Sequence, residues 1–260
     1  MKFEELDARM RIYETTHDQC VLPGIHMVAR LDGRAFTHLC QEVHQFEAPY
    51  DIRFRDHMVA TMEYLVAESG FQILYGYTQS DEISLLFHPE ENSFSRKLRK
   101  FNSVLAGECS AKFSLRLNDL ASFDCRISQL PLISDVIDYF RWRSEDAGRN
   151  ALNAHCYWLL RKQGCDPERA AGDLSGMSIA RKNDFLFKNG INYNDLPAWQ
   201  KRGIGIYWEE FTKEGWNPTT QTPVTAQRRR LKIDYDLPMR DEYDEFIKKL
   251  LEINRVASGK

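Results

Sequence analysis

The 260-residue chain has no apolar run approaching the length that spans a bilayer, and its first seven residues contain no apolar core of a secretory signal. We therefore expect neither a membrane span nor secretion. Low-complexity segments are absent. Only 14 glycines and 9 prolines, together with 12% aromatic residues, exclude an intrinsically disordered chain. The formal net charge of −3 excludes a uniformly basic nucleic-acid binder but leaves room for local basic patches.

Cysteine pairs with metal-ligand spacing are also missing. None of the six cysteines forms a CxxC pair, and no histidine stands at zinc-finger spacing from such a pair. The pattern favours reduced thiols that fill the core over a structural zinc site. Reduced cysteines indicate a cytoplasmic protein.

The elements that are present follow a recognisable order in the first half of the chain. Hydrophobic periodicity predicts helices over 3–16, 51–69 and 95–115, and strands over 25–31, 72–77, 83–88 and 121–128. After the N-terminal helix, the order is strand–helix–strand–strand–helix–strand, which is the split βαβ pattern. We expect an α+β fold with a ferredoxin-like antiparallel sheet and two helices on one face.

The second half of the chain is more helical. Helices are predicted over 134–163, 167–174 and 240–254, and strands over 204–208 and 230–235. A weak boundary near residue 210 predicts two units. Residues 1–210 would form the catalytic domain with a helical elaboration, and residues 211–260 would form a C-terminal extension.

Acidic residues stand at the ends of the predicted strands. Asp32 ends the first strand, and Asp81 and Glu82 occupy the turn of the predicted hairpin. The first strand of a split βαβ sheet lies beside that hairpin, so Asp32 and Asp81 should meet at one edge. Two close carboxylates repel each other unless a cation lies between them, and Mg²⁺ suits two carboxylates plus phosphate. The alternative interpretation is ordinary turn chemistry.

Four motifs carry a resemblance to a known family. They are RLDGRAF at 30–36, GYTQSDEIS at 76–84, KNDFLF at 182–187 and INYN at 191–194. Over about residues 1–210 the chain resembles the tRNA(His) guanylyltransferase family, and within it the bacterial and archaeal guanylyltransferase-like branch. The resemblance implies a polymerase-type palm and a site for two Mg²⁺ ions. It also implies 3′→5′ nucleotide addition to the 5′ end of tRNA after ATP or GTP activation, and a homotetramer.

The same resemblance implies roles for individual residues. Asp32 and Asp81 would bind the metal ions, with the Gly33 carbonyl as a further ligand, and Glu82 would join Asp32 and Asp81 in catalysis. Lys182 would act near the RNA 5′ end. Nucleotide binding is implied for residues of these and neighbouring motifs: Arg30, Arg34, Ala35, Phe36, Asp51, Ser80, Lys97, Lys100, Arg149 and Asn150. For Asp51, a helix N-cap is the competing interpretation.

Two clusters of cations stand out against the low net charge. In the predicted helix that starts near Ser95, the residues Arg96, Lys97 and Lys100 should share one face, which would suit a phosphate or simply face solvent. The basic residues of 228–232 could neutralise phosphates of a tRNA acceptor stem. A solvated charge run is the alternative for both clusters.

Three functions are compatible with these features. The leading hypothesis is a nucleotidyltransferase that repairs or matures the 5′ end of tRNA. A palm-type nucleotidyl cyclase or nucleotide-only transferase would use the same carboxylates, but it would turn over nucleotide without RNA. A non-catalytic tRNA-binding protein would show no Mg²⁺-dependent change in nucleotide affinity.

Overall fold

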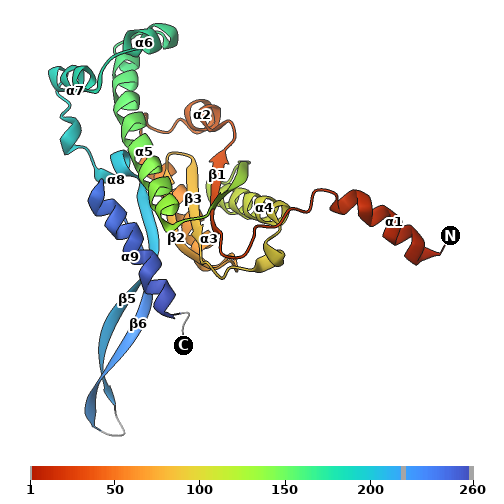
Figure 1. Ribbon diagram of the computed structural model, residues 1–260. Helices are drawn as coiled ribbons and strands as arrows, with labels where there is room; N and C mark the ends of the chain where they lie inside the picture. Colours follow the sequence, from red (N-terminus) through yellow and green to blue (C-terminus); the bar gives the residue numbers. More distant parts are fainter. Residues whose placement is uncertain (1, 218–220, 258–260) are drawn as a thin grey trace.

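The computed structural model describes residues 2–217 and 221–257. Six strands form one antiparallel sheet (Figure 1), in the order β4-β1-β3-β2-β5-β6. They are β1 (His26–Gly33), β2 (Ile73–Gln79), β3 (Glu82–Phe87), β4 (Phe123–Leu130), β5 (Ile204–Asn217) and β6 (Thr222–Asp234). The inner order β4-β1-β3-β2 is that of the split βαβ unit, which confirms the fold predicted from the sequence.

Two helices cover one face of the sheet, as predicted for the palm. They are α3 (Ile52–Ala67) and α4 (Leu98–Leu117). Buried residues of α3 such as Met62, and of α4 such as Phe101 and Phe113, pack against Leu31 and Leu85 of the sheet. Helix α3 begins where Asp51 caps it, because its side chain accepts a hydrogen bond from the Arg53 amide at 2.7 Å.

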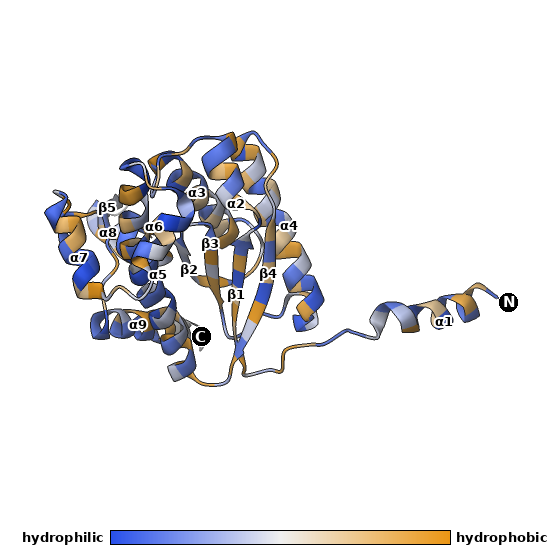
Figure 2. Cartoon of the chain, turned by 90° about the horizontal axis from the view of Figure 1, so that it is seen from above, coloured by the Kyte–Doolittle hydropathy of each residue, from blue (hydrophilic) through white to orange (hydrophobic). Residues whose placement is uncertain are grey.

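The helical second half covers the opposite face. The 30-residue α5 (Ile133–Lys162) and α9 (Asp241–Ala257) pack there, with Phe140 and Tyr243 against Val28, Tyr75 and Leu86. Strands β1, β2 and β3 therefore bury both faces. Figure 2 shows the resulting apolar bands on the strands between the two helical layers. No described helix is both long and apolar enough to cross a bilayer.

Three short helices follow α5, of which the first two extend its end away from the sheet and the third lies beside β2 (Figure 1). They are α6 (Pro167–Leu174), α7 (Ile179–Lys188) and α8 (Ala198–Arg202). A separate small core of Leu160, Leu174 and Leu186 holds α6 and α7 against the end of α5. The sequence predicted α6 but neither α7 nor α8. Helix α7 is only ten residues long and α8 only five, so each offers few turns over which a helical pattern can be recognised.

Strands β5 and β6 are longer than predicted. They continue past the sheet as a two-stranded arm that is exposed along most of its length (Figure 1). The boundary predicted at residue 210 falls inside β5, and the division into two units stays a prediction. At the other end of the chain, α1 (Phe3–Thr15) stands apart from the rest and has no buried residue.

Candidate active site

Backbone pairing brings Asp32 and Asp81 to the same end of the sheet. Asp32 lies opposite Glu82 in the β1–β3 register, and the Gly33 amide donates to the Asp81 carbonyl at 3.0 Å. The β2–β3 turn contains only Ser80 and Asp81, and Ser80 takes a left-handed conformation with φ of 52°. The strand order predicted this juxtaposition, and the tight turn fixes it.

Gly33 leaves room for an aromatic ring directly beneath this end of the sheet. A Cβ atom at position 33 would lie 2.5 Å from the Phe36 ring. Phe36 is almost fully buried, with its ring centroid 4.9 Å from that of Phe123 and 5.2 Å from that of Phe113. The absence of a side chain therefore allows the strand to pass directly over a packed aromatic cluster.

Replacing this glycine is expected to disturb both packing and chemistry. Gly33→Ala would push Phe36 out of its cluster, and overpacking of this kind typically costs about 1–3 kcal/mol. We expect a lower midpoint of thermal unfolding and at least a tenfold loss of activity. Gly107→Ala on the exposed face of α4 is a control for replacing a glycine, because its backbone is helical and nothing lies within 4 Å of a Cβ there. A Gly33→Ala protein as active as the wild type would show that the backbone at this position tolerates displacement.

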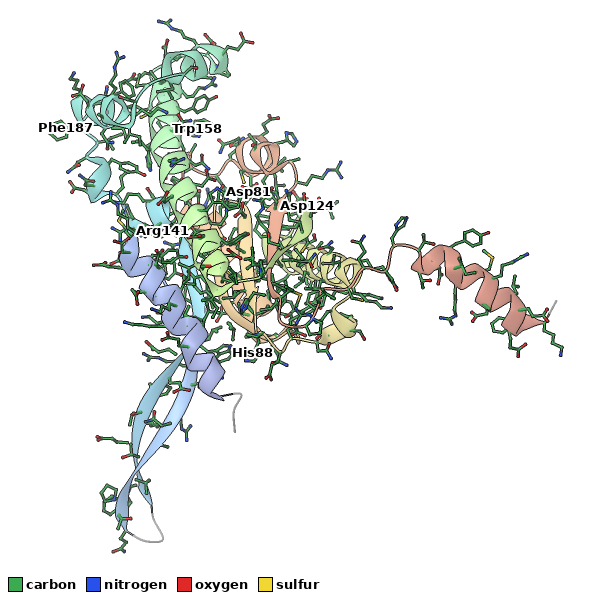
Figure 3. All side chains as sticks on the ribbon, in the orientation of Figure 1. Asp81, His88, Asp124, Arg141, Trp158 and Phe187 are labelled. Carbon is green, nitrogen blue, oxygen red and sulfur yellow. The ribbon has the colours of Figure 1, made fainter. Side chains whose placement is uncertain are left out.

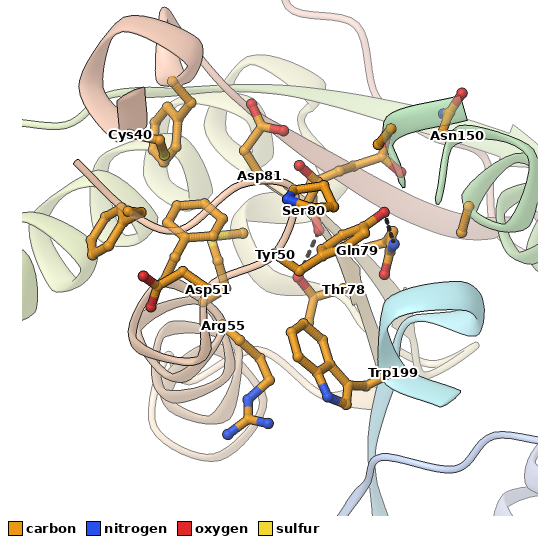
Figure 4. A pocket seen from close by; sticks show the side chains of 18 of the residues that line it. Cys40, Tyr50, Asp51, Arg55, Thr78, Gln79, Ser80, Asp81, Asn150 and Trp199 are labelled. Atoms are coloured by element: carbon orange, nitrogen blue, oxygen red, sulfur yellow. Dashed lines mark hydrogen bonds between the residues drawn. The ribbon is translucent and has the colours of Figure 1, made fainter. Parts of the chain in front are cut away.

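A cavity of about 400 Å³ opens beside the two carboxylates. Figure 4 shows its wall, to which the β2–β3 turn, the loop before α3, α5 and α8 all contribute. Polar groups from the turn meet aromatic rings from the other segments. The residues that bear on function are Asp32, Tyr50, Asp51, Arg55, Gln79, Ser80, Asp81, Glu82, Arg143, Asn150 and Trp199.

The electrostatics of the carboxylate pair favour a bound cation. Burial raises the pKa of Asp81, and the neighbouring Asp32 raises it further, whereas the Asp81 amide and Ser80 lower it by hydrogen bonding. Within 2–217 and 221–257, no group of three or more His, Cys, Asp or Glu side chains is arranged to hold a metal alone. Two carboxylates and a backbone carbonyl instead fit Mg²⁺, which completes its shell with water and substrate phosphates.

The loss of folding stability caused by the Asp32–Asp81 carboxylate pair can be measured without substrate. In metal-free protein at alkaline pH, Asp81→Asn is expected to raise the midpoint of thermal unfolding, because it removes a buried charge beside Asp32. A raised pKa in the folded state means that stability falls as pH rises through it. The gain should therefore shrink toward acidic pH, where wild-type Asp81 is protonated. A variant less stable than the wild type at every pH would contradict this electrostatic account.

Glu82 is held by two arginines rather than facing the carboxylate pair alone. Arg143 of α5 donates from Nε at 2.7 Å and from Nη2 at 2.8 Å, and Arg30 Nε lies 3.8 Å away. Burial raises the pKa of Glu82, and Arg143 opposes that shift. The pair joins α5 to the palm at the cavity wall, so the catalytic role predicted for Glu82 stays a prediction.

The structure gathers only some of the predicted nucleotide-binding residues. Phe36, Asp51, Ser80 and Asn150 line the cavity, and Asp51 lines it while capping α3. Hydrogen bonds from Arg53, and from the backbone amides of Glu47 and Arg53, lower the pKa of Asp51 to about 2. The remaining predicted residues of the first motif and of α5 do not line the cavity, although they lie close to it: Arg30, Arg34, Ala35 and Arg149.

Lys97 and Lys100 lie far from the carboxylates. Lys97 forms an ion pair with Asp18 at 2.8 Å, and its backbone forms an isolated β-bridge with Cys20, which precedes β1. Asp32 lies at the other end of β1. The eight residues of β1 separate the two ends by about 20 Å. The expectation that Arg96 shares their exposed face is wrong. Arg96 is buried and donates to the carbonyl of Ile25 at 2.6 Å, because the backbone turns left-handed at 94–96 before α4 begins.

Several cavity residues were missed by sequence reasoning. Gln79 donates to Tyr50 Oη at 3.2 Å, and the Arg55 guanidinium lies 4.9 Å from the centre of the Trp199 ring. Arg55 and Arg143 are the cations that line the described cavity. In sequence, both look like ordinary charged positions on helices, and only the packing of α3 and α5 around the turn brings them together.

Comparison with known proteins decides the family. A family model described as "tRNAHis guanylyltransferase" matches residues 7–131, and one described as "Thg1 C terminal domain" matches 134–245. The tRNA(His) guanylyltransferase of Debaryomyces hansenii is 32% identical over 82% of this chain and 86% of its own length. The chain belongs to the tRNA(His) guanylyltransferase family. A probable human member is 33% identical over 78% of this chain and 72% of its own length.

Solved structures of family members share this fold. A bacterial tRNA(His) guanylyltransferase-like protein in complex with ATP has a TM-score of 0.75 and 27% identity, over 95% of this chain and 99% of that one. The enzyme of Saccharomyces cerevisiae has a TM-score of 0.71 and 26% identity, over 79% of this chain and 93% of that one. The likeness predicted from the motifs at 30–36 and 76–84 is thereby confirmed. The chain is a member of a family of nucleotidyltransferases.

Proposed function

We propose that this chain adds nucleotides in the 3′→5′ direction to the 5′ end of tRNA, after ATP or GTP activation of the 5′ phosphate. The observation that carries the proposal is the backbone hydrogen bond between Gly33 and Asp81. It holds Asp32 and Asp81 together in the wall of a cavity large enough for a nucleotide. Asp32, Asp81 and the Gly33 carbonyl would hold two Mg²⁺ ions. Bound Mg²⁺ activates an attacking hydroxyl and neutralises charge on the leaving phosphate.

The chain's own residues orient the substrate. Arg55 and Arg143 bring positive charge to a wall otherwise shared by carboxylates and aromatic rings. Tyr50 and Trp199, whose ring centroids are 5.8 Å apart, offer surfaces on which a base can stack. Burial raises the pKa of Tyr50, so its hydroxyl keeps its proton and can donate a hydrogen bond. No side-chain nucleophile is needed, because positioning and electrostatics dominate phosphoryl transfer.

The direct test is incorporation of labelled GTP into a tRNA that lacks its first nucleotide, in Mg²⁺. We expect an RNA longer by at least one nucleotide at its 5′ end, and a 5′-triphosphate RNA should react without ATP. The same reaction without RNA separates the palm-type cyclase or nucleotide-only transferase, which would consume nucleotide alone. A non-catalytic tRNA-binding protein would bind the RNA and leave it unchanged, and that result would refute the proposal.

Three further features belong to the same proposal. The arm presents Arg228, Arg230 and Lys232 on one face, although Glu209 pairs with Arg230 at 2.6 Å and Asp234 pairs with Lys232 at 3.4 Å. We propose that the positive charge of this face that is not neutralised by these acidic residues contacts tRNA phosphates. All six cysteines are free, which supports a cytoplasmic location. A homotetramer is proposed from the family resemblance alone.

A further inference from the structure

A second cavity adjoins the active-site cavity on the side of α6 and α7. Its volume is about 770 Å³, and α5, α6 and α7 form its walls. Asn150, Ala154 and Trp158 line both cavities, so one space continues into the other along α5. We name this second cavity the α5 groove. Figure 3 places Trp158 on the upper half of α5, in the part of the helix that extends beyond the sheet.

The aromatic residues of the α5 groove suit a flat, uncharged ring. Tyr157 and Trp158 are both half-buried, with ring centroids 5.4 Å apart and ring planes at 87°. One ring can therefore stack on a base while the other meets its edge. Asn150 and Asn153 add amide groups that can donate to and accept from a nucleobase.

The charge of the α5 groove suits a single phosphate. None of its lining residues is acidic, and Lys182 is the one cation among them in the described part of the chain. Lys182 Nζ donates to Asn153 Oδ1 at 2.8 Å, which holds the ammonium at the groove wall without neutralising it. A triphosphate would need more cations than one, whereas a phosphodiester carries a single charge. The chemistry therefore favours an RNA strand over a free nucleoside triphosphate.

We propose that the α5 groove binds the 5′-terminal nucleotide of the RNA substrate, with its base stacked on Trp158 and a backbone phosphate near Lys182. This inference rests on the proposed function and adds where the RNA end lies. Because the groove opens into the active-site cavity through Asn150 and Ala154, a nucleotide held there directs its 5′ phosphate toward Asp32 and Asp81.

The test is an equilibrium binding cycle that needs no catalysis. A 3′-labelled tRNA lacking its first nucleotide is titrated without nucleoside triphosphate. A second tRNA has an abasic site at its remaining 5′ position. Trp158→Ala should raise the Kd for the first RNA about tenfold, as expected for loss of one stacked base, and should leave the Kd for the abasic RNA unchanged. Trp158→Phe should keep the wild-type Kd within about threefold.

The control variant is Phe187→Ala on α7, which removes an exposed aromatic side chain outside the groove. Its Kd should match that of the wild type for both RNAs. If Trp158→Ala raises the Kd for both RNAs equally, or for neither, Trp158 does not contact the terminal base and the inference fails. A wild-type protein that shows the predicted cycle but adds no nucleotide would refute the proposed function and leave the groove as an RNA-binding site.

Discussion

Asp32→Ala is expected to reduce nucleotide addition about a thousandfold or more. The Asp32 carboxylate stands beside Asp81 at the cavity, and losing it removes a ligand from the metal site. Metal ions stabilise transition-state charge by several kcal/mol, and each ~1.4 kcal/mol is a factor of ten in rate. The measurement is the single-turnover rate on a 5′-triphosphate tRNA, which bypasses activation. Asp32 is partly exposed, so the variant should fold.

Asp124→Asn is the matched control for that loss. Asp124 lies directly opposite Asp32 in the β1–β4 register, carries the same charge and does not line the cavity (Figure 3). It pairs with Arg126 at 3.1 Å, which reaches Asp32 only at 3.7 Å. We expect Asp124→Asn to keep its rate within about threefold of the wild type. Equal losses in both variants would show that net charge at this sheet edge, rather than metal ligation, sets the rate.

Arg143→Met is expected to cause the largest loss of stability, about 3–5 kcal/mol at neutral pH. Both partners of the Arg143–Glu82 pair are largely buried, and removing one leaves an uncompensated charge. Loss of Arg143 should raise the pKa of Glu82 beyond the increase that burial already causes. The deficit should therefore shrink as pH falls and Glu82 becomes protonated. Denaturant unfolding at pH 7.5 and pH 5 would measure both effects.

Two further variants separate burial from charge. Arg141→Met removes a neighbouring arginine of α5 whose partners, Asp241 and Asp244, are more exposed, and it should cost about 1 kcal/mol or less. The double variant Glu82→Gln with Arg143→Met should recover much of the stability lost by the single change. If the double variant is as unstable as Arg143→Met alone, the stability is lost because the aliphatic part of the arginine no longer packs, and not because the Glu82 carboxylate is unpaired.

Local signals explain what the sequence could predict. Strand and helix periodicity predicted the split βαβ order of elements. Asp51 is a typical N-cap residue, and it predicted the start of α3. The meeting of Asp32 and Asp81 followed from topology, because the strand order of this fold leaves β1 beside the β2–β3 turn. These features depend on short stretches of chain and on a few permitted topologies.

Contacts between distant segments explain what the sequence could not predict. Arg143 reaches Glu82 across 61 residues, and nothing in the periodicity of α5 distinguishes it from the other charged residues of that helix. Lys182 lines the α5 groove because the core around Leu174 and Leu186 folds α6 and α7 back on α5. Lys97 sits at the opposite end of the sheet because α4 starts where β3 finishes.

The central claim is that Asp32 and Asp81 together bind divalent cations with a nucleotide, and Mn²⁺ binding tests it most directly. Mn²⁺ takes the same oxygen ligands as Mg²⁺, and its bound fraction can be followed by electron paramagnetic resonance in the presence of GTP. The account predicts tight Mn²⁺ binding by the wild type and Asp124→Asn, and its loss in Asp32→Ala and Asp81→Asn. Equal Mn²⁺ binding by all four proteins would contradict it.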